Sequence, residues 1–563
     1  MNDKLVNRRI RILVVLFGLI FAVTLGRATW IQAVQGHSYD AMASRQHHET
    51  IEIPAGRGTI YDRTGEPLAI GEQTTTVFAD PRAVLDPKTA AIAAGKSLGL
   101  DPDDVYKRIT DRSKGFVYVR RKADALAAAV LEQRELPGLG FYPEELRSYP
   151  QRDVASHVLG FAGLDNHGLE GLERSLDGTL SGKPGSQTVV KDPFGRAIDV
   201  VESRPERPGK HVTLTIDNQI QAHAESVLAR YVRRWDARGG TAIVLDRRTG
   251  AVLAMANAPT FDANRFAVTS ADLRRNRAVT DLYEPGSTFK LVTIAAALED
   301  GVVTPRTPFT LPSSIKVADR VIHEHDYRPT TRMTVRQIVS GSSNVGTVTI
   351  AELLGPGALA GWIERFGFGK RTGVDFPGES PGLALPLERW SGSTIGTVPI
   401  GQGIAVTPIQ MVSAYAAIGN HGLLMRPRLV QKVGGKGTKI GAGRRVVSRR
   451  TADRMMAMLR DVVVEGTGTE AAVPGYTVAG KTGTASKAEN GGYSRSNYVA
   501  SFVGLVPAKN PRVAILVTID EPKGAIWGGV VAAPAFAEIA RFDLQYLEVP
   551  PDAPQTRIAL STR

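Results

Sequence analysis

The first 34 residues place the strongest constraint on how this chain can fold. An uncharged, apolar run extends from Ile12 to Gly26, and a second uncharged stretch, residues 28–36, follows the single charge of Arg27. A helix over residues 12–34 is long enough to cross a bilayer, which needs about 20 residues. A basic cluster, which marks the cytoplasmic side of such a helix, precedes it: Lys4, Arg8, Arg9 and Arg11. The sequence therefore predicts a cytoplasmic tail (1–11), one transmembrane anchor (12–34) and a remainder of the chain that lies outside the cytoplasm.

A cleaved signal peptide is the alternative interpretation of this segment. The run is long for a signal peptide, and no convincing small-x-small cleavage site follows it. An uncleaved, single-pass anchor is therefore favoured. Because Arg27 is costly at the middle of a bilayer, we expect it near the outer edge or against a partner helix.

Composition narrows the classes of protein further. Hydrophobic residues make up 42% of the 563 residues, which is enough for a full core. Cysteine is absent, which excludes disulfides, thiol catalysis and cysteine-ligated zinc. The formal net charge of +13 favours anionic partners such as acidic lipid or a wall polymer, with a generally basic surface as the plain alternative. No basic block interleaved with aromatic residues stands out, so no nucleic-acid partner is predicted.

The rest of the chain divides at a charged Pro/Gly segment, residues 204–209. Residues 35–208 mix strand-like and helical pieces, including a strand-turn-strand over 55–69 and a helix that opens at 168–173. After the linker we expect a strand over 211–216, a helix from about Asn218 and a β-hairpin over 240–257. Helical patterns dominate 287–418, strands return at 476–484, 498–504 and 513–519, and a last helix covers 535–546. This order predicts an α+β domain, 209–547, in which helices pack an antiparallel sheet, followed by a flexible tail, 548–563.

The first of three short polar motifs is Ser287-Thr288-Phe289-Lys290, which follows Pro285-Gly286. Pro-Gly favours a turn, and the apolar pattern behind the motif predicts a helix. Ser287 then lies in the first turn, with Lys290 on the same face three residues later. A lysine whose pKa is lowered by burial or by a second cation can take the proton of a serine hydroxyl. Alone the motif is weak, because serine is also a common helix cap.

The other two motifs are Ser342-Ser343-Asn344 and Lys481-Thr482-Gly483-Thr484. The first falls in a tight loop between two predicted helices, where a hydroxyl can relay a proton and an amide can bind a peptide group. The second falls at the end of a predicted strand, where Gly483 lets another backbone approach and the threonines can bind a carboxylate. Lys481 would supply the second cation that keeps Lys290 neutral. In isolation, an ordinary Ser/Asn turn is the preferred explanation of the first of these motifs, and a glycine-rich turn is the alternative for the second.

A nucleotide-binding loop is a sharper alternative for the third motif, because residues 475–482 match the pattern G-x-x-x-x-G-K-T. Such a loop must open a helix whose N-terminus holds phosphate. The residues from Thr484 to Gly492 are polar and Gly/Ser-rich rather than helical. Nucleotide binding is therefore disfavoured.

Taken together and in this order, the three motifs resemble the signature of penicillin-recognising serine acyltransferases. The resemblance covers nearly the whole chain and is to class B penicillin-binding proteins. It includes a run from Arg57 to Ala69, the segment Gly168–Glu173, and residues 401–410 and 527–534. It implies a penicillin-binding transpeptidase fold with a helical subdomain, on an elongated mixed α/β pedestal of the dimerisation type. We expect Arg57, Asp62 and Arg63 to form a local, structural ion-pair network.

The resemblance implies a β-lactam-sensitive peptidoglycan D,D-transpeptidase that acts through a serine acyl-enzyme. Ser287 would attack the D-Ala–D-Ala bond of a stem peptide. The implied roles of the other residues are general base for Lys290, proton relay for Ser342, donor to the substrate amide for Asn344, positive field for Lys481, and substrate binding for Thr482, Gly483 and Thr484. The backbone N–H groups of Ser287 and Thr484 would form the oxyanion hole. No metal or cofactor is implied, and His323-Glu324-His325-Asp326 is interpreted as a polar loop.

The implied partners are a SEDS-type glycan polymerase and the membrane proteins of the divisome. Residues 284–290 and 401–410 look more like the septal, cell-division type than the elongation type. Alternatives are an elongation-type transpeptidase, a D,D-carboxypeptidase, a β-lactamase or a non-catalytic β-lactam sensor. A β-lactamase needs a deacylating carboxylate that the sequence does not identify, and a sensor would usually have further spans and a cytoplasmic domain.

Overall fold

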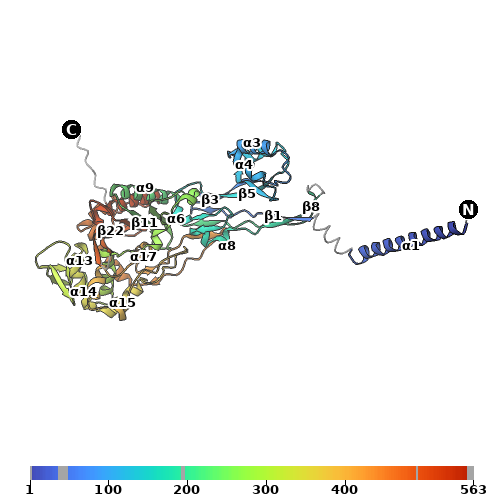
Figure 1. Cartoon of the computed structure of the whole chain (residues 1–563). Helices are drawn as coiled ribbons and strands as arrows, with labels where there is room; N and C mark the ends of the chain where they lie inside the picture. Colours follow the sequence, from blue (N-terminus) through green and yellow to red (C-terminus); the bar gives the residue numbers. More distant parts are fainter. Residues whose placement is uncertain (1–2, 36–47, 192–196, 490–491, 554–563) are drawn as a thin grey trace, which may run out of the picture. The chain divides into compact units, whose positions relative to one another are not determined.

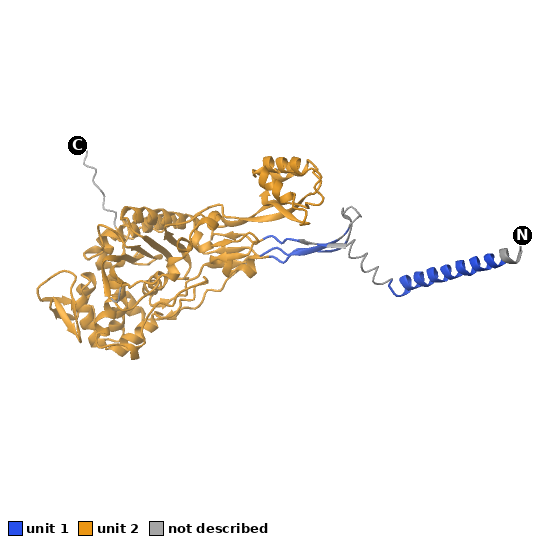
Figure 2. Ribbon diagram, viewed as in Figure 1, with its two compact units in different colours: residues 1–56, 182–209 blue, residues 57–181, 210–563 orange. Residues whose placement is uncertain are grey.

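The computed structural model describes residues 3–35, 48–191, 197–489 and 492–553 (Figure 1). The chain separates into two compact units, which Figure 2 colours differently. The first unit holds residues 1–56 and 182–209, and the second holds residues 57–181 and 210–563. The second unit therefore contains all three polar motifs.

The first unit combines a long helix with a small sheet. Helix α1 spans Asp3–Ala33, and within it the part from Asn7 to Ala33 is long and apolar enough to cross a membrane. This stretch is exposed along its whole length, as expected for a helix that needs an apolar solvent. The antiparallel sheet has the order β1 (His48–Ile53), β8 (Gly185–Lys191), β9 (Ala197–Arg204). The predicted N-terminal apolar helix is thus confirmed.

A seven-stranded sheet organises the N-terminal part of the second unit. Its order is β19 (Lys436–Gly437), β18 (Val430–Val433), β10 (Val212–Leu214), β2 (Ile60–Tyr61), β3 (Pro67–Ala79), β4 (Val117–Asp124), and β5 (Leu139–Ser148) also pairs with β3. Helices α3 (Pro87–Leu98), α4 (Pro102–Ile109) and α5 (Ala125–Glu132) pack beside it around one apolar cluster. Each helix begins at an aspartate whose side chain accepts from free backbone N–H groups, namely Asp86, Asp101 and Asp124.

The five-stranded sheet that carries the third motif is antiparallel. Its order is β12 (Val252–Ala258), β11 (Gly239–Asp246), β23 (Val513–Asp520), β22 (Gly492–Val506), β21 (Ala479–Glu489), so β21 is an edge strand. Alternate residues of β11 face opposite sides, because side chains alternate along a strand. Ala242 and Val244 pack with helices α9 (Asn218–Arg234) and α20 (Ala533–Tyr546), whereas Ile243 and Leu245 pack with α17 (Pro408–Gly419). Helices thus cover both faces, and the predicted α+β fold is confirmed.

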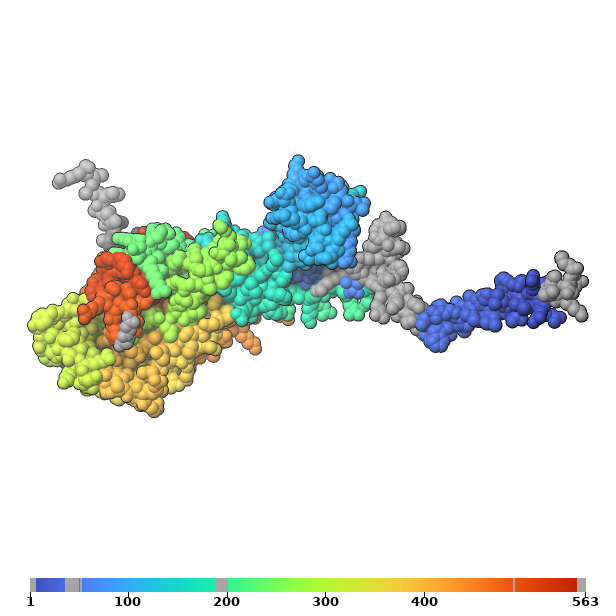
Figure 3. All heavy atoms as spheres, viewed as in Figure 1, coloured from blue at the N-terminus to red at the C-terminus, as the bar shows by residue number. Residues whose placement is uncertain are grey.

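The middle of the chain supplies the helical subdomain, which in the space-filling view forms the yellow-to-orange side of the second unit (Figure 3). It contains η2 (Gly286–Phe289), α12 (Lys290–Glu299), α13 (Val335–Ser340), α14 (Asn344–Leu354), α15 (Pro356–Arg365) and α18 (Arg449–Val464). Helices dominate residues 287–418, as expected, but residues 308–334 form two small two-stranded sheets. In these, β13 (Pro308–Leu311) pairs with β16 (Thr331–Thr334), and β14 (Ser314–Val317) pairs with β15 (Arg320–His323).

Shorter elements complete the second unit. They are α6 (Ser156–Leu159), β6 (Phe161–Ala162), β7 (Gly168–Glu170), α7 (Gly171–Ser175), α8 (Asp177–Leu180), η1 (Ala263–Val268), α10 (Ala271–Arg274), α11 (Arg277–Thr280), η3 (Leu387–Arg389), α16 (Thr394–Thr397), η4 (Val398–Ile400), β17 (Leu423–Leu424), β20 (Arg444–Arg445), η5 (Thr469–Ala471) and α19 (Gly528–Val531). The helix expected to open at residue 168 begins only at Gly171, because residues 168–170 pair as a strand with β6.

The segment after α20 packs on the domain, although we expected a flexible tail from residue 548. The Tyr476 hydroxyl donates to the Val549 carbonyl at 2.7 Å, and the backbone N–H of Thr477 donates to the Asp552 carboxylate at 2.6 Å. The Lys509 amine also donates to the Asp552 carbonyl at 2.6 Å. These contacts hold the chain in place through Asp552. The rest of the expected tail, residues 554–563, lies outside the described residues.

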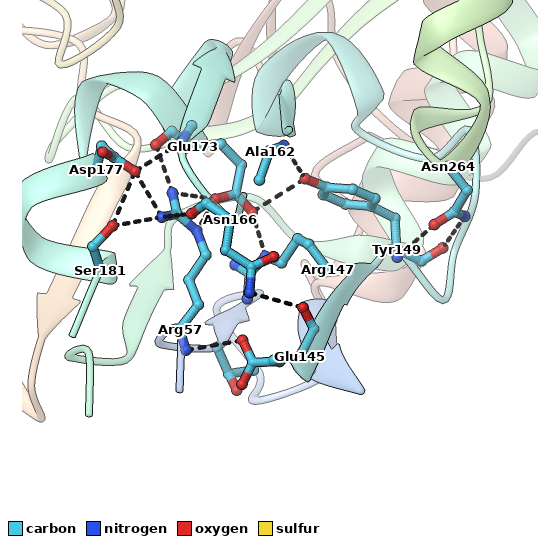
Figure 4. Close-up of polar contacts among 12 residues, drawn as sticks. Arg57, Glu145, Arg147, Tyr149, Ala162, Asn166, Glu173, Asp177, Ser181 and Asn264 are labelled. Atoms are coloured by element: carbon cyan, nitrogen blue, oxygen red, sulfur yellow. Dashed lines mark hydrogen bonds and ion pairs between the residues drawn. The ribbon is translucent and has the colours of Figure 1, made fainter. Parts of the chain in front are cut away.

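A buried ion-pair network lies at the start of the second unit (Figure 4). The Arg57 guanidinium lies 2.7 Å from the Glu173 carboxylate and 2.6 Å from that of Asp177, and Arg147 binds Glu173 at 2.6 Å. The Tyr149 hydroxyl donates to the same Glu173 carboxylate. The side chains of Arg57, Arg147 and Glu173 are at most 1% exposed. One carboxylate therefore compensates two buried guanidinium groups.

Asp62 and Arg63 take no part in that network, contrary to the sequence-based expectation. Arg63 pairs with Asp217 at 2.6 Å. The Asp62 carboxylate instead accepts from the backbone N–H groups of Thr64, Glu66 and Asn218. Asp62 and Arg63 thus both contact the start of helix α9, whereas Arg57 binds the carboxylates of Glu173 and Asp177.

Candidate active site

Ser287 lies in the 3-10 turn η2, which runs directly into helix α12. The preceding Gly286 has a φ of +53°, which disfavours residues with a side chain, and a Cβ there would lie 2.8 Å from the Thr484 carbonyl oxygen. A Cβ on Gly483 would lie 2.9 Å from the Pro285 carbonyl oxygen. Two glycines therefore let the backbone before Ser287 lie directly against strand β21. The first and third motifs meet at this contact.

Lys290 connects the first motif to the second. Its amine donates to the Ser342 carbonyl oxygen at 2.5 Å and to Oδ1 of Asn344 at 2.7 Å, and it lies 3.3 Å from the Ser342 hydroxyl. The Lys290 residue is 2% exposed. Burial lowers the pKa of Lys290 to about 7, and the Glu324 carboxylate partly opposes that shift. A substantial share of neutral amine is therefore present near neutral pH.

The Ser342-Ser343-Asn344 turn joins helices α13 and α14, as predicted. A capping box at Thr334 and Gln337 starts α13, and the Ser343 hydroxyl caps α14 by accepting from the Gly346 N–H. Ser342 has a left-handed φ of +58°. Such a conformation is uncommon for a residue with a side chain and occurs often at functional sites.

The side-chain amide of Asn344 is partly engaged. Its Oδ1 accepts from Lys290, and its Nδ2 donates to the His323 carbonyl oxygen at 3.0 Å. An asparagine amide carries two N–H donors, and the described residues provide an acceptor for one of them.

Glu324 fixes this turn, and the sequence reasoning missed it. Its carboxylate accepts from the Ser343 hydroxyl at 2.5 Å, from the Asn344 N–H at 2.9 Å and from Arg328 at 2.6 Å. Its side chain is 6% exposed. The sequence indicates only a polar loop at residues 323–326. No local pattern links Glu324 to the Ser342-Ser343-Asn344 turn, which lies some 20 residues later in the chain. The contact depends on the small β14–β15 hairpin that precedes it.

Lys481, Thr482, Gly483 and Thr484 lie near the start of β21 rather than at the end of a strand over 476–484. The strand begins at Ala479 and continues to Glu489, with Lys481 opposite Val503 and Thr484 opposite Ala500 on β22. Since residues 485–489 extend a strand, the helix that a nucleotide-binding loop requires is not formed there. The phosphate-loop alternative is therefore wrong.

The third motif is supported from its other side by residues 527–529. The Gly528 N–H donates to the Thr484 hydroxyl at 3.1 Å, and the Thr482 hydroxyl lies 2.7 Å from that of Thr467. The ring of Trp527 meets the His325 ring edge-on at 4.0 Å between centroids. This ring contact joins the segment behind the third motif to the loop that carries Glu324.

Lys481 is 1% exposed, and its amine lies 3.3 Å from the Thr482 hydroxyl. Burial, and secondly the charge of Lys290, lower the pKa of Lys481 well below its usual value. The sequence predicted that the charge of Lys481 lowers the pKa of Lys290, but burial lowers that pKa and Lys481 is not among its causes. The charge effect runs from Lys290 to Lys481 instead.

One predicted contact is absent from the described residues, a hydrogen bond between Ser287 and Lys290. The amine of Lys290 is turned toward Ser342 and Asn344, which occupy its donors. The two residues are nevertheless one helical turn apart at the junction of η2 and α12. Hydrogen bonds of catalytic groups are often long or misaligned before substrate binds.

Comparisons with known proteins agree with this arrangement. The family model "Penicillin binding protein transpeptidase domain" matches residues 240–541, and "Penicillin-binding Protein dimerisation domain" matches residues 52–214. Peptidoglycan D,D-transpeptidase FtsI of Escherichia coli is 34% identical, over 95% of this chain and 91% of that protein. Stage V sporulation protein D of Bacillus subtilis is 35% identical, over 98% of this chain and 87% of that protein.

A solved structure shows the same fold over most of the chain. Penicillin binding protein 3 from Mycobacterium tuberculosis, complexed with aztreonam, aligns with a TM-score of 0.70 and 32% identity, over 90% of this chain and 99% of that one. The two family models together account for most of the described residues outside α1. The chain therefore belongs to the class B penicillin-binding proteins, and it is a serine-type peptidoglycan D,D-transpeptidase.

Proposed function

We propose that Ser287 is the nucleophile of this transpeptidase and that Lys290 is its general base. The observation that carries the assignment is the buried Lys290 amine, one turn from Ser287 and bonded to both Ser342 and Asn344. A neutral amine takes the proton of the Ser287 hydroxyl while its oxygen attacks the D-Ala–D-Ala carbonyl. The C–N bond then breaks, and the proton passes through the Ser342 hydroxyl to the departing D-Ala amine.

Strand β21 positions the donor peptide in this proposal. An edge strand offers unpaired backbone groups to an extended peptide. The hydroxyls of Thr482 and Thr484 and the field of Lys481 favour the terminal carboxylate. The backbone N–H groups of Ser287 and Thr484 stabilise the oxyanion of the tetrahedral intermediate. An amine of a second stem peptide then attacks the acyl-enzyme, which forms the cross-link and frees Ser287.

The same geometry makes β-lactams covalent inhibitors. The β-lactam carbonyl acylates Ser287 and the ring opens, but the ring nitrogen stays bonded to the rest of the acyl group. No leaving group therefore departs from the site, and its position stays closed to an acceptor amine. The relative from Mycobacterium tuberculosis is described as complexed with aztreonam. We infer the same susceptibility for this chain.

We also propose a septal role for this chain. In this proposal α1 is a single-pass membrane anchor, the N-terminus is cytoplasmic and the second unit of the chain is extracytoplasmic. The identity with FtsI and the basic residues before the apolar helix support this proposal. A SEDS-type glycan polymerase and divisome membrane proteins are the proposed partners. The equally similar Stage V sporulation protein D favours a second candidate, a sporulation-specific role. A fluorescent fusion found at midcell in growing cells supports the septal role, and one found only in sporulating cells supports the second.

The test of the nucleophile is labelling by a fluorescent penicillin. We expect one adduct per chain, mapped by peptide mass to Ser287, and complete loss of labelling in Ser287→Ala. Ser270→Ala removes an exposed serine that makes no side-chain cap hydrogen bond, so it serves as the matched control and should label normally. Labelling that persists in Ser287→Ala, with the adduct on another residue, would rule out the proposed chemistry.

A further inference from the structure

A cavity of about 650 Å³ opens in the second unit between the end of helix α15, the loop after it, helix α17 and the two-stranded β17–β20 sheet. Its size is within the usual range for pockets that bind small molecules. None of its described lining residues belongs to the candidate active site. The cavity is therefore a separate feature of the molecule.

The charge that lines this cavity is strongly one-sided. Five cationic side chains and a single carboxylate line it: Arg365, Lys370, Arg371, Arg426, Arg444 and Glu364. Lys370 pairs with Glu364, and the charge of Arg365 helps to lower the pKa of Glu299. Three guanidinium groups that line the cavity, those of Arg371, Arg426 and Arg444, have no carboxylate partner among the described residues. A concave surface of this kind attracts oxyanions, and planar guanidinium groups bind carboxylates through two parallel hydrogen bonds.

Buried polar side chains hold the loop that carries Lys370 and Arg371. The Gln410 amide, 4% exposed, donates to the Lys370 carbonyl oxygen at 2.8 Å. The Glu379 carboxylate, 6% exposed, accepts from the Thr372 N–H at 2.6 Å and from the Gly373 N–H at 3.0 Å. The cations therefore project from a fixed backbone, which lowers the entropy lost when a ligand binds.

Two of the arginines are themselves held by backbone carbonyls. Arg426 donates through Nε to the Gly373 carbonyl oxygen, and Arg444 donates through Nη1 to the Arg365 carbonyl oxygen. Each guanidinium keeps further N–H donors for a ligand. The Arg365 guanidinium lies over the Trp362 ring at 4.7 Å. Arg371 has no hydrogen bond or ion pair in the parts of the chain that the structure describes, and it is exposed.

We propose that this cavity is a second binding site for peptidoglycan and that it takes the free carboxylates of an uncross-linked stem peptide. The inference rests on the proposed stem-peptide substrate, whose carboxylates complement the guanidinium groups of Arg371, Arg426 and Arg444. An uncross-linked peptidoglycan strand bound in this cavity raises the local concentration of stem peptide near the active site that consumes it. The cavity would act on substrate binding and not on the chemical step, since it holds no residue of the candidate active site.

The experiment separates this cavity from the active site by blocking Ser287. Purified full-length protein is first acylated to completion with benzylpenicillin, so that added peptide cannot enter the active site. Binding of a dye-labelled synthetic stem pentapeptide ending in D-Ala–D-Ala is then measured by fluorescence anisotropy. The same peptide with its carboxylates amidated is the ligand control, and inorganic phosphate is the competitor.

Arg371→Glu is the test variant, and Arg450→Glu is its matched control. Both side chains are exposed and without a partner among the described residues, and Arg450 lies on α18 outside the cavity. We expect the acylated wild type to bind the peptide, Arg371→Glu to bind roughly tenfold more weakly, and Arg450→Glu to bind as the wild type does. The amidated peptide should not bind, and phosphate should displace the carboxylate form.

The inference is overturned if the acylated wild type does not bind the peptide, or if the amidated peptide binds equally well. It is also overturned if Arg371→Glu and Arg450→Glu weaken peptide binding to the same extent. Fluorescent penicillin labelling of each variant before acylation reports on the proposed function separately. Normal labelling with no peptide binding removes the second site and leaves the Ser287 chemistry standing. Absent labelling of a folded wild type counts against the Ser287 chemistry instead.

Discussion

At the scale of single residues, Glu324 is the side chain that most changes the description of the site. Its carboxylate binds both the Ser343 hydroxyl and the Asn344 N–H, so it positions the turn that meets Lys290. Its negative charge also raises the pKa of Lys290 against the larger lowering by burial. Glu324 is thus a positioning residue with an electrostatic effect on the proposed base.

We expect Glu324→Gln to slow acylation by a fluorescent penicillin roughly tenfold, because a buried, charge-assisted contact is replaced by a weaker one. The acylation rate of the wild type should rise with pH through about 7, since Lys290 acts as a base only after it loses its proton. Removing the Glu324 charge lowers the pKa of Lys290, so this rise should move to lower pH. Second-order acylation rates between pH 5.5 and 9 measure both effects.

Glu324→Asp is the control for this prediction, because it keeps the charge and shortens the side chain by one methylene. It should leave the midpoint of the pH profile near that of the wild type even if the rate falls. If Glu324→Gln acylates more slowly but the midpoint of its pH profile equals that of the wild type, then Glu324 has a structural role and no electrostatic effect on Lys290.

At the scale of elements, the network around Glu173 ties the start of the second unit together. Glu173 is the carboxylate between Arg57 and Arg147, and all three side chains are almost fully buried. Glu173→Ala should lower the free energy of unfolding by about 3–5 kcal/mol, because it leaves two buried cations without that partner. Chemical denaturation would show this as a lower midpoint.

Asp104→Ala is the control, because it removes an exposed partner of Lys107. It should lower the free energy of unfolding by less than about 1 kcal/mol. Equal losses of stability in the two variants would contradict the role given to Glu173.

The segment after α20 gives a second prediction for an element. The Asp552 carboxylate accepts from the Thr477 backbone, just before β21 begins. Asp552→Ala should therefore destabilise the domain by about 1–3 kcal/mol, since a backbone donor loses its partner. Gln545→Ala, an exposed change on α20, should alter thermal unfolding little. If Asp552→Ala unfolds at the wild-type temperature, the segment is not part of the stable domain.

Local patterns predicted many of these elements. Helix α9 begins at Asn218 and the β11–β12 hairpin turns near Gly250, as expected, because a helix cap and a polar, glycine-containing turn between two apolar runs act over a few positions. The three motifs could be located for the same reason. The pairing of β13 with β16, the true start of β21 and the role of Glu324 depend on partners farther along the chain, such as β22 for β21. No short window of sequence contains that information.

At the scale of the whole molecule, the candidate active site and the apolar helix belong to different compact units. Removing residues 1–35 should therefore release the protein from membranes while fluorescent penicillin still labels it at the full-length rate. Fractionation without detergent and a labelling time course test this expectation. As a control, the full-length protein should require detergent for extraction. Loss of labelling in a truncated protein that still unfolds cooperatively would show that the site needs the helix.

The left-handed backbone at Ser342 limits how this enzyme can vary over generations. Threonine would keep the hydroxyl, but its branched Cβ is strained at a φ of +58°. Glycine, asparagine and aspartate relax that backbone, yet each discards the alcohol that meets Lys290. Changes that ease the turn lose the chemistry, and the change that keeps the chemistry distorts the turn. Substitutions that confer resistance to β-lactams are therefore expected at other positions of the chain rather than at Ser342.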